Sequence, residues 1–172
     1  LGFVNASADP AILREIPTFR EWTRGAAERA RELGYSVDQF WLQDANCSAT
    51  RLVELLQARG IRGLIVAGLQ NDGILPPSHA EIWSDFSTVV IGLRPQEPPL
   101  HFTANDQFST ARYAVAALRM GGYTRIGLVI DLRIDAWLEH RFCAGFFSEG
   151  KGSGGRVFDF AKNEREAFGR WL

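Results

Sequence analysis

The 172-residue sequence is poor in several features that would assign it to a class at once. Two cysteines, Cys47 and Cys143, lie far apart, which favours free thiols and leaves one disulfide as the alternative. Its 19 basic and 20 acidic residues give a formal net charge of -1, so it lacks the basic excess of domains that bind nucleic acid by bulk electrostatics. No apolar run approaches the roughly 20 residues of a membrane span.

Signals of catalysis are also scarce. The three histidines, His79, His101 and His140, lie on separate segments, and no Gly-x-Ser-x-Gly elbow is present. His140 and Cys143 have only a loose metal-ligand spacing, so we expect no metal site and no cofactor. A small α/β enzyme would need an acid/base or metal constellation that this sequence does not contain, and we therefore expect no enzymatic activity.

The two ends of the sequence resemble interior segments. The chain begins in an apolar run, Leu1–Val4, without an initiator methionine or a signal-peptide pattern. It stops inside a helical pattern at Trp171 and Leu172. We interpret the sequence as a piece of a longer protein.

Short apolar runs alternate with longer amphipathic stretches. The predicted strands cover residues 1–5, 35–42, 61–67, 88–92, 101–104, 125–131 and 157–158. The predicted helices cover residues 18–33, 48–59, 78–84, 106–120, 136–147 and 162–172. Thr18 with Glu21 fits a capping box, Ser48 fits an N-cap, and Gly34 fits a helix end. Regular alternation of this kind predicts an α/β fold with a parallel sheet covered by helices on both faces.

Ligands of such sheets bind beyond the carboxyl ends of the strands. Asn5 ends the first predicted strand and Ser7 follows it, Leu69 follows the third, and Asp131 ends the sixth. We therefore name these residues as candidate ligand-binding residues.

Aromatic residues open the first predicted helix at the same edge. Phe19 and Trp22 lie near the polar positions Asn5 and Ser7, and rings beside short amide and hydroxyl groups suit a sugar or a nucleoside. The alternative is that both rings are core residues that anchor the loop.

Several segments, in this order and spacing, resemble the effector-binding domain of the LacI/GalR family of transcriptional regulators. They are LGFV at residues 1–4, GAAERARELGY at 25–35, RGIRGLIV at 59–66, NDQF at 105–108, LRMGGYTRIGL at 118–128 and HRFCAGF at 140–146. Together they cover about residues 1–147 of the chain.

The resemblance implies a periplasmic-binding-protein type I fold, with two Rossmann-like lobes of parallel sheet flanked by helices. Residues 1–124 would form the N-terminal lobe, and residues 125–172 would begin an incomplete C-terminal lobe. A helix-turn-helix headpiece would precede Leu1 and is absent from this sequence.

The resemblance also implies a function. Such regulators are cytoplasmic homodimers that bind a sugar or nucleoside effector in the cleft between the lobes and couple it to operator DNA through the headpiece. The alternative is a periplasmic sugar-binding protein of an ABC transporter, which shares the fold but is exported. Neither class implies contact with a membrane through this domain.

By position, the resemblance assigns ligand contact to Asp106 and Arg141, with Asp106 reaching the effector from the first lobe and Arg141 from the second. Trp137 completes the candidate ligand-binding set. The alternatives are that Asp106 serves only as an N-cap and that Arg141 is a solvated helix residue.

Overall fold

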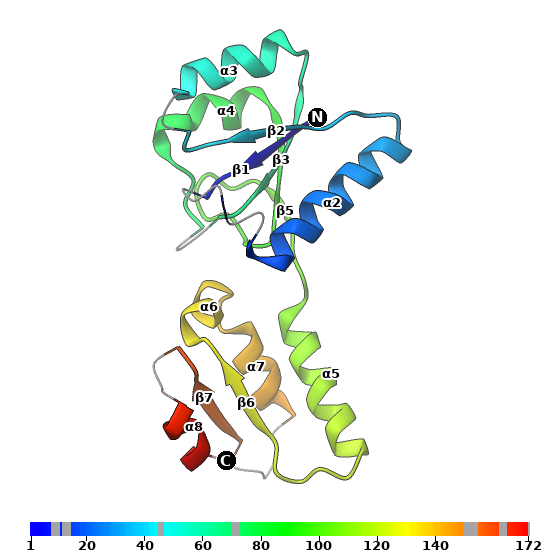
Figure 1. Ribbon diagram of the computed structural model, residues 1–172, viewed down its shortest axis with the longest axis vertical. Helices are drawn as coiled ribbons and strands as arrows, with labels where there is room; N and C mark the ends of the chain where they lie inside the picture. The colour runs from blue at the N-terminus through cyan, green and yellow to red at the C-terminus, as the bar shows by residue number, and fades with distance from the viewer. Residues whose placement is uncertain are drawn as a thin grey trace. The chain divides into compact units, whose positions relative to one another are not determined.

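The computed structural model describes residues 1–7, 11, 15–44, 47–69, 73–149, 155–161 and 165–171. They form two compact units, Leu1–Ala104 and Asn105–Leu172, each with its own parallel sheet (Figure 1). The fold is therefore α/β, as the alternation of apolar runs and amphipathic stretches predicts. None of the described helices has both the length and the apolar character that crossing a bilayer requires.

The first unit is built on a five-stranded sheet in the order β2-β1-β3-β4-β5, with every neighbouring pair parallel. Its strands are β1 (Gly2–Asn5), β2 (Asp38–Trp41), β3 (Gly63–Ala67), β4 (Ser87–Ile91) and β5 (His101–Thr103). All four residues of β1 are buried, because this strand lies between two others and is covered on both faces.

Helices cover both faces of this sheet. Figure 1 shows α3 (Ala49–Ala58) and α4 (Ala80–Asp85) together on one side and α2 (Pro17–Glu32) on the other, and a short turn of 3-10 helix, η1 (Pro77–His79), leads into α4. One hydrophobic cluster joins α3, α4 and the sheet, and its fully buried members include Leu56, Ile82 and Val66.

The helix ends show which capping signals are correct. Ser48 caps α3, and its Oγ accepts a hydrogen bond from the Arg51 N–H at 3.2 Å. The predicted capping box at Thr18 is wrong, because α2 begins one residue earlier with Ile16 as its N-cap. Pro17 sets this start, since its fixed φ and missing N–H suit the first helical position.

The second unit pairs β6 (Gly127–Ile130) with β7 (Arg156–Asp159) in parallel. Its helices are α5 (Gln107–Met120), α6 (Leu132–Trp137), α7 (Arg141–Ser148) and α8 (Arg165–Trp171). Helix α5 packs closely on α7, and Gly145 makes this possible because a Cβ there would lie 2.9 Å from the backbone carbonyl carbon of Phe108.

The packing of α5 on α7 places α5 in the second compact unit. The sequence-based boundary differs, since it assigns residues 1–124, and so the whole of α5, to the first lobe. That boundary describes the lobes of a complete effector-binding domain, and it stays a prediction.

The predicted single helix over residues 136–147 is wrong, because two helices, α6 and α7, occupy this stretch. Glu139 and His140 between them have left-handed φ values of 57° and 58°. The reason lies in Asp135, whose buried Oδ1 accepts hydrogen bonds from the N–H groups of Phe142 at 3.0 Å and Cys143 at 3.4 Å. Amide groups in the first turn of a helix have no partner within it, so Asp135 stabilises a new helix start here.

Candidate functional site

Polar side chains lie where β1 ends, at the carboxyl edge of the first sheet. Asn5 is the last residue of β1, and both Asn5 and Ser7 are buried, with 1% and 3% of their surface exposed. The Asn5 Oδ1 accepts a hydrogen bond from the Ser7 N–H at 3.0 Å, which holds the backbone just beyond the strand. The structure thus brings these two candidate residues together.

The amide of Asn5 is only partly satisfied. Its Nδ2 is buried and has no hydrogen-bond partner among the described residues. Gly68, just after β3, closes over the same amide: its φ is +82°, and a Cβ there would lie 2.6 Å from Asn5 Oδ1. A buried donor without an acceptor is unfavourable, so this amide marks a position where a bound hydroxyl or water would add stability.

Phe19 and Trp22, on the first turns of α2, form an aromatic pair. Their rings meet edge to face, with centroids 5.1 Å apart. Trp22 also lies against Gly92, the residue after β4, where a Cβ would contact Cη2 and lie 2.8 Å from Cζ3 of the indole. Both rings are half-buried, so they pack on the unit and still present part of their surface to solvent.

Leu69 occupies a different environment from the polar candidates. Its side chain is 8% exposed and belongs to the hydrophobic cluster that also contains Leu75 and Trp83. Its place in the apolar core accounts for its burial.

The second unit brings Asp106 and Arg141 together at the starts of two helices. Asp106 caps α5, and its Oδ1 accepts a hydrogen bond from the Ser109 N–H at 3.0 Å. The hydrogen bonds from Ser109, with a smaller contribution from Arg141, hold the pKa of Asp106 below its usual value. Asp106 is thus an N-cap, as its alternative interpretation proposed, and its carboxylate also faces a guanidinium.

Arg141, the first residue of α7, lies between two carboxylates. Its Nη2 is 3.8 Å from Asp106 Oδ1, and its Nη1 is 3.8 Å from Glu139 Oε2. Both separations exceed the length of a hydrogen bond. Asp106 and Arg141 both belong to the second compact unit. That they reach a ligand from different lobes of a complete effector-binding domain stays a prediction.

Asp131 directly follows β6 and caps α6. Its side chain is buried, and its two oxygens accept hydrogen bonds from Arg133 Nη2 at 2.8 Å and Nε at 3.1 Å. This charge-assisted pairing lowers the pKa of Asp131 and raises that of Arg133. Trp137, the last residue of α6, is 38% exposed.

Sequence reasoning missed two residues that shape this region, Glu139 and Asp135. Glu139 adds a second carboxylate beside Arg141 only because its left-handed backbone turns the chain there. Asp135 is fully buried and faces His140, with 3.6 Å between Oδ2 and Nδ1. No sequence motif marks either residue. Both contacts depend on the break between α6 and α7, and the sequence pattern of this stretch predicts one continuous helix.

Two of the surface cavities that the described residues form lie in the first unit, away from the candidate ligand-binding residues. One, of about 530 Å³, is mostly apolar and is lined by Ile74, Leu75, Pro76, Trp83 and Pro98 among others. The second, of about 420 Å³, includes Cys47, Ser48 and His79. None of the nine candidate residues lines either of these two cavities.

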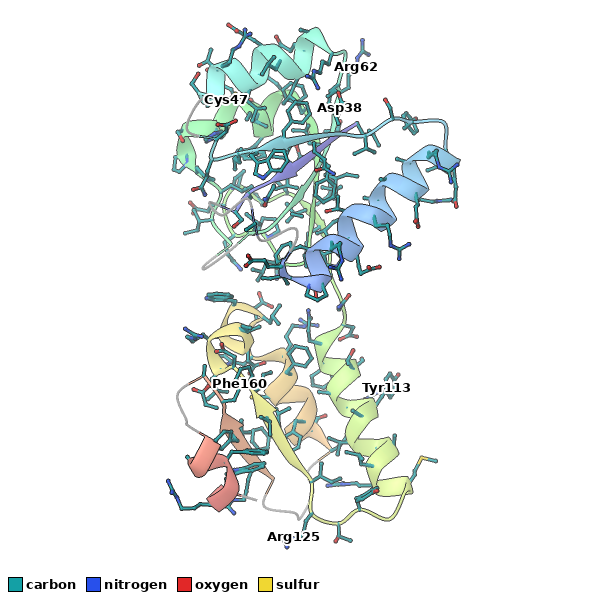
Figure 2. All side chains as sticks on the ribbon, in the orientation of Figure 1. Asp38, Cys47, Arg62, Tyr113, Arg125 and Phe160 are labelled. Atoms are coloured by element: carbon teal, nitrogen blue, oxygen red, sulfur yellow. The ribbon has the colours of Figure 1, made fainter. Side chains whose placement is uncertain are left out.

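The two cysteines are free thiols, as their separation in the sequence favours. Cys47 lies just before α3 (Figure 2), and Cys143 lies in α7. Within the ranges that the structure describes, no three His, Cys, Asp or Glu side chains are grouped so as to hold a metal ion.

The fold has known counterparts among solved structures. A LacI transcriptional regulator from Lactobacillus brevis is 18% identical with a TM-score of 0.62, over 100% of this chain and 63% of its own. The Cra transcriptional dual regulator from Pseudomonas putida, in complex with fructose 1-phosphate, is 18% identical with a TM-score of 0.57, over 91% of this chain and 57% of its own. The transcriptional regulator CelR, in complex with cellobiose, is 16% identical with a TM-score of 0.61, over 92% of this chain and 50% of its own.

No family model and no curated protein matches the sequence. At the identities of these solved structures the likeness shows the fold, so the resemblance to LacI-family regulators is confirmed at that level. The chain has the periplasmic-binding-protein-like α/β fold of those regulators, and it spans between 50% and 63% of the length of these three matched chains.

Proposed function

We propose that this chain is the effector-binding part of a bacterial transcriptional regulator and that it binds a small sugar-like molecule at the carboxyl ends of its parallel strands. One observation carries the proposal: Asp106 and Arg141 start two helices and face each other, 3.8 Å apart, in a fold shared with regulators solved with fructose 1-phosphate and with cellobiose. The role is binding rather than catalysis, and it requires no cofactor.

The proposed chemistry combines polar and apolar recognition. In the second unit, Asp106 would accept hydrogen bonds from hydroxyl groups and Arg141 would donate to them. In the first unit, taken by itself, the buried Nδ2 of Asn5 is a candidate donor. The half-buried rings of Phe19 and Trp22 would cover the apolar C–H face of a sugar ring. Ser7, Asp131 and Trp137 remain candidate contacts by position, and Leu69 would act through packing.

The coupling to DNA lies outside this chain. We propose a cytoplasmic homodimer whose helix-turn-helix headpieces, supplied by sequence beyond these 172 residues, bind operator DNA. An effector that favours one conformation of its binding domain would change how the two headpieces fit the operator.

The test begins with a thermal-shift screen of neutral sugars, sugar phosphates and nucleosides on the intact protein, because a ligand that binds the folded state raises its melting temperature. Titration calorimetry then compares the strongest ligand on the wild type and on Asp106→Ala. We expect roughly a ten- to hundredfold loss of affinity, as for a hydrogen bond to a charged group.

Asp106→Ala also removes a helix cap, so a matched control is needed. Ser48→Ala removes the cap of α3 in the first unit and should leave affinity unchanged. Unaltered affinity in Asp106→Ala would reject the assignment of this residue, and the absence of any binding in the screen would reject the proposed function.

A further inference from the structure

We infer that the effector is an uncharged polyol, such as a neutral sugar, and that the charges of the second unit disfavour its phosphorylated or carboxylated counterparts. The inference rests on the proposed function and specifies its ligand class. It follows from how the arginines near the carboxyl ends of β6 and β7 are already paired.

Arg141 is the cation best placed to receive an anionic group, and two carboxylates already face it. Asp106 Oδ1 and Glu139 Oε2 each lie 3.8 Å from one of its terminal nitrogens. Neither forms a direct hydrogen bond at that distance, so the positive charge is balanced while the guanidinium makes no direct hydrogen bond to either carboxylate. All three side chains are about half exposed and accessible to a ligand.

This spacing suits a hydroxyl group better than an anion. A hydroxyl donates one hydrogen bond and accepts others, so a single hydroxyl can accept from Arg141 and donate to Asp106. A phosphate dianion or a carboxylate offers acceptors only, and at Arg141 it would lie beside the two carboxylates without a proton to share with them. Like charges brought together in this way oppose binding.

The second arginine of this region, Arg133, is also paired with a carboxylate. Arg133 makes a bidentate pair with Asp131, with contacts of 2.8 Å and 3.1 Å. An anion that captured Arg133 would leave the buried Asp131 carboxylate without its counter-charge. Arg133 is therefore a poor receptor for a phosphate group.

Buried carboxylates make the local balance negative. Three aspartates of the second unit are at most 8% exposed: Asp131 directly after β6, Asp135 in α6 and Asp159 at the end of β7. Together with Asp106 and Glu139 they outnumber the cationic and basic side chains described beside them, Arg133, Arg141, His140 and Arg112, the last of which acts on Asp106.

The experiment uses ligands that differ only in charge. The intact protein is titrated calorimetrically with glucose, glucose 6-phosphate and gluconate, with fructose and fructose 1-phosphate, with ribose and ribose 5-phosphate, and with a nucleoside and its monophosphate. In whichever series binds, we expect the neutral member to bind at least about tenfold more tightly than its charged counterparts.

Two variants link this preference to the named carboxylates. Asp106→Asn keeps an oxygen for the α5 cap, and Glu139→Gln keeps the side-chain length. Each should raise the affinity for the charged member relative to the neutral one by roughly two- to fivefold, the size of one exposed charge interaction. Glu54→Gln removes a similarly exposed carboxylate on α3 of the first unit and should leave the ratio unchanged.

The outcomes separate the two proposals. A charged member that binds as tightly as its neutral partner overturns this inference and leaves the proposed function standing. A ratio that shifts no more in Asp106→Asn and Glu139→Gln than in Glu54→Gln also overturns it, since the discrimination would then come from elsewhere. If no member of any series binds, the proposed function fails and this inference fails with it.

Discussion

Gly92→Ala tests whether Trp22, which pairs with Phe19 in the first unit, packs against Gly92 as the structure describes. Gly92 follows β4 with φ +103°, and a Cβ there would contact Cη2 and lie 2.8 Å from Cζ3 of Trp22. Carbon atoms in contact prefer separations of roughly 3.5–4.0 Å, so the indole has to move by about 1 Å or the strand end has to shift. The substitution therefore combines backbone strain with overpacking.

The magnitude follows from these two contributions. A left-handed conformation costs a residue with a Cβ about 1–2 kcal/mol, and overpacking of this kind costs about 1–3 kcal/mol. Gly34, also in the first unit, has φ +80°, and no atom lies within 4 Å of the position that a Cβ would occupy, so Gly34→Ala introduces strain alone. We expect Gly92→Ala to lower the free energy of unfolding by about 1–3 kcal/mol more than Gly34→Ala does.

Urea denaturation followed by circular dichroism measures the unfolding free energy of each variant. A double-mutant cycle adds Trp22→Leu: without the indole, Gly92→Ala should cost no more than Gly34→Ala, which gives a coupling energy of about 1–3 kcal/mol. Equal costs for the two glycine substitutions, or a coupling energy near zero, would refute the seating of Trp22 on Gly92. It would also remove the basis for treating Trp22 as a surface for a sugar ring.

The remaining predictions concern capping, core packing and a thiol. Ser48→Ala should destabilise the first unit by about 1 kcal/mol in urea denaturation, because the Arg51 N–H loses its acceptor, and Ser48→Asp should restore most of this. Leu56→Ala, at a side chain with no exposed surface, should cost about 2–5 kcal/mol, clearly more than the same change at the half-buried Leu55; similar costs at the two positions would contradict the packing described for α3. Burial, followed by the nearby Asp135, raises the pKa of the Cys143 thiol to about 12, so its folded form should resist iodoacetamide at pH 8; rapid labelling in a Cys47→Ser protein would disprove this. Because the folded state holds that proton more tightly than the unfolded state, stability should fall as pH rises from about 9 to 12, and Cys143→Ala should reduce this loss.

Local signals predicted most of the first unit correctly. The run Leu64-Ile65-Val66 has the continuous apolar character of a strand buried on both faces, and it lies in β3. Ser48 and Gly34 mark helix ends through chemistry that acts within a few residues, and the structure has both at the predicted positions. Such features depend on neighbours in sequence, so they can be recognised without the fold.

The errors occur where distant or unexpected partners decide the outcome. Helix α2 begins at Pro17, and Thr18 is not its N-cap, because proline is favoured at the first helical position. Residues 136–147 have a helical composition, yet the Asp135 carboxylate stabilises a second helix start and the chain turns at Glu139 and His140. Asp135 accepts hydrogen bonds from the start of α7, several residues further along the chain. Such a cap produces no periodic pattern in the sequence.

By itself the sequence determined the class of fold, the order of the strands and of the helices apart from the division between α6 and α7, and which polar residues lie at the strand ends, because these depend on local periodicity and on the geometry of parallel sheets. Only the tertiary structure decided which of those residues meet. It joined Asp106 to Arg141 within one compact unit, added Glu139 to the pair, and seated Trp22 on Gly92. Such pairings join residues distant in sequence through helix packing and left-handed turns, and the balance of charge around Arg141 exists only once they have formed.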